Sequence, residues 1–318
     1  MNIALDMMGG DFAPLEAVKG VKEFLQDNKE QLQLLLVGDE ALLPQHIKDE
    51  AVNEGSWKIV HAPQMIEMHE HPTKALKEKT QSSIAIGFHL LATGETDAFI
   101  SAGNTGAMMV GALFSIKNIE GVSRPVIGAY MPREDGSLGL LADVGLNADC
   151  KPENLDQFAL LGSLFAEHIL KIQNPKVGLI NLGEEEGKGN LLTQAAYNLL
   201  KKNTQLNFIG NIEGRDILLH KADVMICDGF TGNVVLKLAE SIHDITRRRK
   251  IKDEHFDRFN FEMYGGVPVL GVAKPVIIGH GISHSTAFKN MIVTAQKMIS
   301  SQLTEKIKMS FASLHKTT

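Results

Sequence analysis

The sequence predicts a three-layer α/β/α fold built around a largely parallel sheet. Short apolar runs, rich in Val, Ile and Leu, alternate along the chain with longer segments whose apolar residues recur three and four positions apart. Such alternation is typical of a parallel sheet that helices cover on both faces. The chain has 318 residues, 44% of them hydrophobic, so it contains ample apolar material for such a core.

About ten of the short runs are predicted strands. They span residues 2–6, 32–37, 58–61, 97–101, 126–131, 138–143, 177–181, 207–210, 224–228 and 276–279. Most are separated by segments of helical period, such as residues 14–26, 154–171 and 191–202. The pattern predicts a single α/β catalytic domain over residues 1–318, extended enough to form two lobes.

Two segments depart from this alternation. Residues 238–263 predict a short, charged helical excursion, with the basic run Arg247–Lys250 followed by Phe256, Phe259 and Phe261. Residues 284–315 keep a helical apolar period throughout and predict one long C-terminal helix.

Composition excludes several classes of protein. There are 32 Lys and Arg against 38 Asp and Glu, a formal charge of −6, which gives no basic field for nucleic acid. Two cysteines indicate a reducing compartment, and no apolar run reaches the roughly 18 residues that span a bilayer. The N-terminus lacks the basic start of a signal peptide, so we expect a cytoplasmic protein.

Four glycine-rich loops follow predicted strands, and in a parallel sheet ligands bind at these strand ends. Glycine lets the backbone approach a ligand closely, and the start of a helix supplies unpaired N–H donors, a combination that suits an anion. None of the loops has the dinucleotide or P-loop spacing. The residues predicted to bind substrate are Gly9, Gly10, Asp11, Ser101, Gly103, Asn104, Thr105, Gly106, Asp228, Gly229 and Gly232.

Lys188 lies between two glycines in the third loop, residues 181–190, where its ammonium group can neutralise a bound anion. His280, at the end of a predicted strand, is a candidate for proton transfer. Cys227 lies in a strand and is expected to be buried and inert, and Cys150 has no His beside it in sequence. The sequence contains no G-x-S-x-G, H-E-x-x-H or C-x-x-C motif, and we predict no metal and no cofactor.

The order of these loops resembles the bacterial phosphate acyltransferases of the PlsX family. The matching strings are residues 6–14, 101–107, 143–145 with 149–153, 181–190, 228–233, and 264–272 with 280–283. They run nearly the length of the chain in the family's order.

The resemblance implies acyl transfer from acyl-acyl carrier protein to inorganic phosphate, giving acyl phosphate for phospholipid synthesis. It implies the fold of isocitrate and isopropylmalate dehydrogenases and of phosphotransacetylase, and a homodimer whose active site contains Lys188 and Asn233. Family members carry a long apolar hairpin that docks on the membrane, whereas residues 238–263 are short and charged here. We therefore expect only weak, peripheral contact with the anionic inner face of the cell membrane.

Two other functions fit the sequence less well. A metal- and NAD-dependent hydroxyacid dehydrogenase of the same fold would need Asp143, Asp149 and Asp228 to converge on a divalent ion. A non-catalytic module that binds carrier protein would depend on the basic run Arg247–Lys250.

Overall fold

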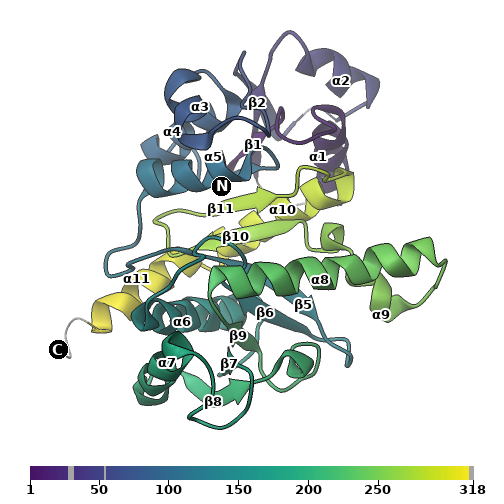
Figure 1. Cartoon of the computed structure of the whole chain (residues 1–318). Coiled ribbons are helices and arrows are strands. Elements are labelled where there is room, and N and C mark those ends of the chain that lie inside the picture. The colour runs from purple at the N-terminus through teal and green to yellow at the C-terminus, as the bar shows by residue number, and fades with distance from the viewer. Residues whose placement is uncertain (28–31, 54, 315–318) are drawn as a thin grey trace. The chain divides into compact units, whose positions relative to one another are not determined.

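The computed structural model describes residues 1–27, 32–53 and 55–314, and the chain divides into two compact units (Figure 1). The first unit comprises residues 1–118 and 261–304, and the second comprises residues 119–260 and the segment from residue 305 onward. The chain therefore leaves the first unit, completes most of the second, and returns.

The first unit contains a sheet in the order β3-β2-β1-β4-β11-β10. All neighbouring strands are parallel except β10 and β11, which are antiparallel. The strands are β1 (Asn2–Asp6), β2 (Gln33–Gly38), β3 (Trp57–His61), β4 (Ala98–Ser101), β10 (Gly266–Leu270) and β11 (Val276–Gly279). The helices are α1 (Leu15–Asp27), α2 (Leu43–Asp49), α3 (Pro72–Glu78), α4 (Ser83–Thr93), α5 (Thr105–Gly111), the π-helix η1 (Ala112–Ile116), the 3₁₀ turn η3 (Phe261–Met263) and α10 (Ser285–Ser300).

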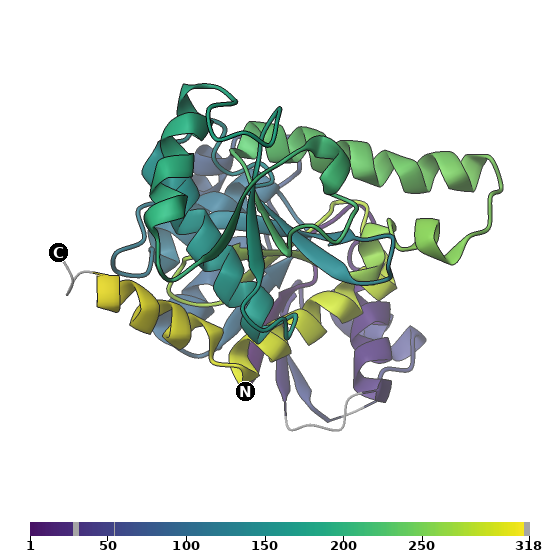
Figure 2. The same ribbon diagram turned by 90° about the horizontal axis from the view of Figure 1, so that it is seen from below.

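Successive side chains of these strands point to opposite faces of the sheet, so the sheet has a buried layer on each side. Ala4, Phe99 and Ile278 share one core cluster with Phe88 of α4 and Met108 of α5. Helices α1 and α10 pack against each other, and α10 contacts β4 and β11 on the face of the sheet opposite to α4 and α5 (Figures 1 and 2). The first unit thus has the three predicted layers.

The second unit contains a sheet in the order β5-β6-β9-β7-β8, in which only β5 and β6 are antiparallel. Its strands are β5 (Val126–Pro132), β6 (Leu138–Ala142), β7 (Lys176–Ile180), β8 (Asn207–Ile212) and β9 (Val224–Ile226). Its helices are α6 (Pro152–His168), α7 (Leu191–Lys202), the 3₁₀ turn η2 (Gly214–Asp216), α8 (Gly229–Arg248) and α9 (Glu254–Asp257). Helix α6 packs closely on this sheet, since a side chain at Gly162 would come within 2.7 Å of Val224. The mixed, largely parallel sheet covered by helices confirms the predicted fold class.

The structure corrects the two irregular segments. The predicted helix at 284–315 is two helices, α10 and α11 (Leu303–Leu314), within the described residues. The hydroxyls of Ser300 and Ser301 bond to the carbonyls of Gln296 and Met298, which competes with the helical pattern, and Gln302 adopts a φ of 54°. The excursion predicted at 238–263 instead begins at Gly229, because α8 runs without a break to Arg248.

In the part of the chain that the structure describes, no helix combines the length and hydropathy needed to cross a bilayer.

Candidate active site

In the first unit, two glycine loops meet over a buried carboxyl group. Strands β1 and β4 are parallel neighbours, so their last residues, Asp6 and Ser101, lie side by side. The Ser101 hydroxyl donates to Asp6 Oδ2 at 2.6 Å and accepts from the Gly103 amide at 2.9 Å. The Met8 amide donates to Asp6 Oδ1 at 2.9 Å. Asp6 and Ser101 have no exposed surface, so this network lies beneath the loops.

The loop after β1 is packed tightly against this network. A side chain at Gly9 would overlap the Asp6 carboxylate and come within 2.7 Å of the Gly103 amide nitrogen. Gly10 has a φ of 108°, which favours glycine, and the Asp11 amide donates to the carbonyl of Gly281 at 2.7 Å. The loops after β1, β4 and β11 therefore lie next to one another at the carboxyl ends of their strands.

Asn104 has a different role from the predicted one. Its Oδ1 accepts from the Ala107 amide at 3.0 Å and caps α5. Its Nδ2 donates to the carbonyls of Glu67, Met68 and Glu70 at 2.9 to 3.2 Å. The side chain is only 4% exposed, so it holds segment 67–70 against α5 and has no donor left for a substrate.

The hydroxyl of Ser101 is used internally in the same way. Of the three polar side chains predicted to line the phosphate rim, only that of Thr105 is exposed. Gly106 packs against Pro72, where a side chain would overlap the proline ring. The outward surface of this loop is therefore formed by the Thr105 hydroxyl and by backbone groups.

His280 follows β11 and lies in the first unit with these loops. Its ring centroid is 4.5 Å from that of Phe261, at an interplanar angle of 49°. Nearby, Phe12 stacks on His284 at 4.7 Å. Met68, whose methyl group is the atom nearest to a side chain built at Gly281, is exposed together with Ile282. Apolar side chains thus border the glycine loops of this unit.

In the second unit, the loop after β9 is fixed to the loop after β6. Asp228 caps α8, accepting from the Thr231 amide and hydroxyl, both at 2.9 Å. The Gly229 amide donates to the carbonyl of Asn147 at 2.7 Å. Gly232 lies so close to the carbonyl oxygen of Asp143 that any side chain would overlap it. The first turn of α8 is therefore held directly against residues 143–147.

Asn233 belongs to that first turn and is exposed, and its Nδ2 donates to the carbonyl of Val144 at 3.2 Å. Its carboxamide oxygen remains outside this hydrogen bond. Gly145, with a φ of 130°, passes so close that a side chain there would come within 2.9 Å of the Asn233 nitrogen. The loop after β6 thus orients the Asn233 amide.

Asp143 supports this loop from beneath. Its Oδ2 accepts from the Asn147 amide at 2.6 Å and from Asn147 Nδ2 at 2.9 Å, and its Oδ1 accepts from the amides of Ile127 and Leu146. Burial raises the pKa of Asp143, and these hydrogen bonds oppose the shift. Burial also raises the pKa of the neighbouring Cys150 thiol to about 11, which leaves it a poor nucleophile.

The loop that carries Lys188 follows β7, the parallel neighbour of β9. Asn181 Nδ2 donates to the carbonyl of Lys188 at 3.1 Å, and Gln194 Nε2 donates to the carbonyls of Gly187 and Gly189. Gly189 has a φ of 101°, which lets the loop turn into α7. These contacts fix the backbone around Lys188.

The charges of this loop are distributed so that Lys188 has the weakest ion pair. Glu184 pairs with Lys221 at 2.7 Å, and Glu186 pairs with Lys201. Lys188 Nζ lies 4.0 Å from Glu185 Oε1, and its side chain is half exposed. An incoming anion can therefore displace Glu185 at small energetic cost, because exposed pairs of this kind contribute little.

The structure brings the predicted residues together in two sets, one in each unit. The first unit holds Gly9, Gly10, Asp11, Ser101, Gly103, Asn104, Thr105, Gly106 and His280, and the second holds Lys188, Asp228, Gly229, Gly232 and Asn233. Sequence reasoning missed the supporting roles of Asp6 and Asp143. The available signal was an acidic residue at the end of an apolar strand directly before a glycine loop.

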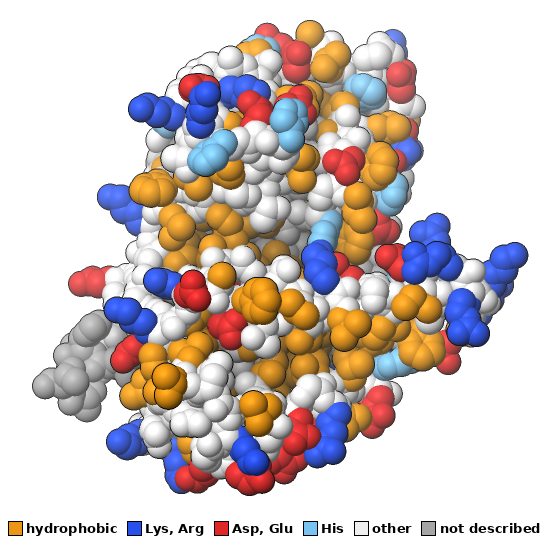
Figure 3. Space-filling model, viewed as in Figure 1, with side chains coloured by type: hydrophobic (Ala, Val, Ile, Leu, Met, Phe, Trp, Pro, Cys, Tyr) orange, Lys and Arg blue, Asp and Glu red, His pale blue; other side chains and the backbone are white. Residues whose placement is uncertain are grey.

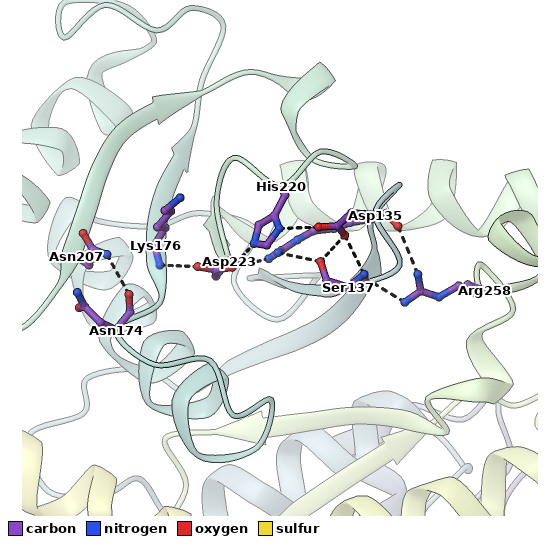
Figure 4. Close-up of polar contacts among 9 residues, drawn as sticks. Asp135, Ser137, Asn174, Lys176, Asn207, His220, Asp223 and Arg258 are labelled. Carbon is purple, nitrogen blue, oxygen red and sulfur yellow. Dashed lines mark hydrogen bonds and ion pairs between the residues drawn. The ribbon is translucent and has the colours of Figure 1, made fainter.

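A further polar cluster lies at the opposite ends of the second unit's strands (Figure 4). The fully buried Arg133 donates to Asp223 at 3.0 Å, and His220 lies 2.6 Å from Asp135 and 3.4 Å from Asp223. Arg258 donates to the carbonyl of Ser137 at 3.1 Å and so ties the end of α9 to the β5–β6 turn. Because parallel sheets bind ligands at their carboxyl ends, we assign this cluster to stability.

Comparison with known proteins places the chain in a family. A family profile described as "Fatty acid synthesis protein" matches residues 1–306. A phosphate acyltransferase of Dictyoglomus turgidum is 42% identical over 327 residues, which cover 96% of each chain. A phosphate acyltransferase of Aquifex aeolicus is 43% identical over 328 residues, again with 96% of each chain covered.

A solved structure supports the same fold. The phosphotransacetylase of Streptococcus pyogenes superimposes with a TM-score of 0.65 over 94% of each chain, at 18% identity. At this identity the likeness concerns the fold alone, and it confirms the predicted similarity to phosphotransacetylase.

The dehydrogenase alternative finds no support at its predicted ligands. Asp143 accepts hydrogen bonds at both oxygens and Asp228 caps α8. Among the residues that the structure describes, no three His, Cys, Asp or Glu side chains gather as a metal site would require. The family profile matches residues 1–306, and relatives that share 42 to 43% of their residues cover 96% of the chain. Together with the motifs, these matches show that the chain belongs to the bacterial phosphate acyltransferase family.

Proposed function

We propose that the protein transfers a fatty acyl group from acyl-acyl carrier protein to inorganic phosphate, giving acyl phosphate for phospholipid synthesis. The observation that carries this proposal is the Lys188 loop. Its backbone is fixed, and Glu184 and Glu186 are paired with Lys221 and Lys201. The Lys188 side chain is half exposed, with Nζ 4.0 Å from Glu185. Family membership supports phosphate as the acceptor.

The chemistry needs positioned charges and donors more than a nucleophilic side chain. A phosphate oxygen attacks the thioester carbonyl carbon, the carbonyl oxygen takes up negative charge, and the C–S bond then breaks to release the thiolate. Lys188 and the Asn233 amide stabilise the developing charge, and His280 supplies a proton to the leaving sulfur. The Thr105 hydroxyl and the backbone of the glycine loops contact the phosphate.

The proposed partners follow from exposed surfaces of the second unit. Phe230, Val234, Leu238 and Ile245 of α8 are 45 to 68% exposed, and Figure 3 shows hydrophobic side chains along this helix. An apolar surface of this kind supports the predicted homodimer.

The end of α8 supports weak, peripheral contact of this cytoplasmic protein with the anionic inner face of the cell membrane. Arg247 to Lys250 are exposed there, as is Lys252. Phe259, which follows this basic run, is only 5% exposed and so offers no apolar surface to a membrane. The attraction is therefore mainly electrostatic.

Incubation of the protein with acyl-acyl carrier protein and phosphate tests the reaction directly. We expect release of free thiol together with an acyl phosphate that hydroxylamine traps as hydroxamate. Lys188→Ala should lower turnover by about 10²–10³-fold, as expected when one charge-stabilising group is removed. Lys202→Ala, which removes another exposed lysine of the same unit, is the matched control. Thiol release without hydroxamate, or an unchanged Lys188→Ala turnover at saturating phosphate, would contradict the proposal.

A further inference from the structure

Asp6 is a fully buried carboxyl group to which the proposed chemistry assigns no task. It accepts from the Ser101 hydroxyl at 2.6 Å and the Met8 amide at 2.9 Å, and the Gly9 amide and the Ser83 hydroxyl lie close enough to lower its pKa. Burial raises the pKa of Asp6, and all four donors oppose that shift. Each of the two carboxylate oxygens therefore has a hydrogen-bond donor, Met8 at Oδ1 and Ser101 at Oδ2.

The contacts of Asp6 reach both glycine loops of the first unit. It bonds directly to the Met8 amide in the loop after β1. Through Ser101, whose hydroxyl accepts from the Gly103 amide at 2.9 Å, it also reaches the loop after β4. The two loops touch at Gly9, where a side chain would come within 2.7 Å of the Gly103 nitrogen. A shift of the Asp6 carboxylate would therefore move both loops.

We propose that Asp6, acting through Ser101, is a positioning residue that sets the two glycine loops in the geometry that binds phosphate. The proposal rests on the function proposed above. In a protein interior a carboxyl group is costly to bury, and a residue with fewer acceptors would leave loop amides unpaired. The amides of Met8 and Gly103 donate to buried oxygens, those of Asp6 and Ser101. The anion would then contact the outer part of the loop after β4, at Thr105 and Gly106.

Ser101→Ala is the sharpest test, because it removes one oxygen atom and the connection from Asp6 to Gly103. We expect the KM for phosphate, and the dissociation constant for phosphate alone, to rise about threefold to tenfold, as the loss of one hydrogen bond implies. The KM for acyl-acyl carrier protein should stay within twofold. Asp6→Asn, which keeps the shape of the side chain, should change the phosphate constants in the same direction.

Ser82→Ala is the matched control. Ser82 is a fully buried serine of the same unit whose hydroxyl accepts from the Ala85 amide at 3.3 Å and caps α4. It should lower the melting temperature without changing the phosphate constants. Equal effects of the two serine variants on phosphate, or unchanged phosphate constants in Ser101→Ala, would overturn the proposal. If Asp6→Asn does not fold, the serine pair still decides the question.

Direct phosphate titration separates this proposal from the proposed function. If the unsubstituted protein makes acyl phosphate and binds phosphate, but Ser101→Ala binds it equally well, only the role of Asp6 is wrong. If the unsubstituted protein makes no acyl phosphate, the proposed function is wrong, and the titration then reports on the loops alone.

Discussion

Replacement of Asn104 by Ala separates a structural role from a ligand-binding one. The sequence predicted that Asn104 binds substrate, whereas the structure uses both ends of its side chain internally. Because these internal hydrogen bonds would be lost, Asn104→Ala should destabilise the protein. A residue whose only role were to contact phosphate would change the KM for phosphate at little cost in stability.

The expected loss can be worked out from the hydrogen bonds. Removal of the cap on α5 costs about 1 kcal/mol. The two N–H groups of the amide serve three carbonyls, those of Glu67, Met68 and Glu70, so at most two full hydrogen bonds are lost. At about 0.5–1.5 kcal/mol each, they bring the total decrease in the free energy of unfolding to about 2–4 kcal/mol.

Urea denaturation followed by circular dichroism measures this loss, and two further variants divide it. Asn104→Ser keeps a capping oxygen and should recover about 1 kcal/mol relative to Ala. Asn104→Asp also keeps the cap but places a carboxylate against three carbonyl oxygens, so it should be at least as unstable as Ala. A variant Asn104→Ala with unchanged stability and a raised KM for phosphate would refute the structural role.

Three further outcomes follow from the second unit. Because the pKa of Cys150 is about 11, only about one thiol in a thousand is ionised at pH 8. Alkylation of Cys150 by iodoacetamide should therefore be slow at pH 8 and should accelerate about tenfold per pH unit up to pH 10. Fast labelling at pH 8 would contradict this. The methyl group of Gly232→Ala would overlap the Asp143 carbonyl, so this variant should lower the free energy of unfolding by at least about 1–3 kcal/mol. Gly214→Ala is the control, because its methyl group would point into open space, and it should change that free energy by less than about 0.5 kcal/mol. Replacement of Arg247 to Arg249 by Ser should abolish co-sedimentation with anionic vesicles, a loss of about 1 kcal/mol per charge, and leave acyl transfer in solution unchanged; binding that survives high salt would show an apolar contribution.

Helices and strands were predictable from the sequence where the spacing of apolar residues and the Gly or polar residues at the ends of a segment indicate the same boundaries. The strand at residues 2–6 and the helix at residues 191–202 have the predicted bounds. Strand β10 was missed because Gly266 and Pro268 argue against a strand, whereas pairing with the distant β11 stabilises it there. The break after Ser300 was missed because the apolar period continues across it, while a local competition for hydrogen bonds ends the helix.

The candidate site was predictable as a set of loops, though not as a set of ligands. Glycines at strand ends showed where the backbone of one loop comes close to another loop, as at Gly9 and Gly232. The direction of a side chain depends on which donors and acceptors the fold leaves unpaired, and that is decided by segments distant in sequence. Asn104 illustrates this, since its partners at Glu67, Met68 and Glu70 carry no sequence signal.

The two units use the same device at their glycine loops. In each, a buried aspartate at a strand end accepts from the backbone amides of the following loop: Asp6 from Met8, and Asp143 from Leu146 and Asn147. A carboxylate beneath an anion site would repel the anion if its charge were unscreened. Here its lone pairs are occupied by N–H and O–H dipoles whose positive ends face it, which reduces the field that reaches the surface. These hydrogen bonds fix the backbone of the loops, so at the proposed phosphate site little ordering of the loops would have to accompany binding.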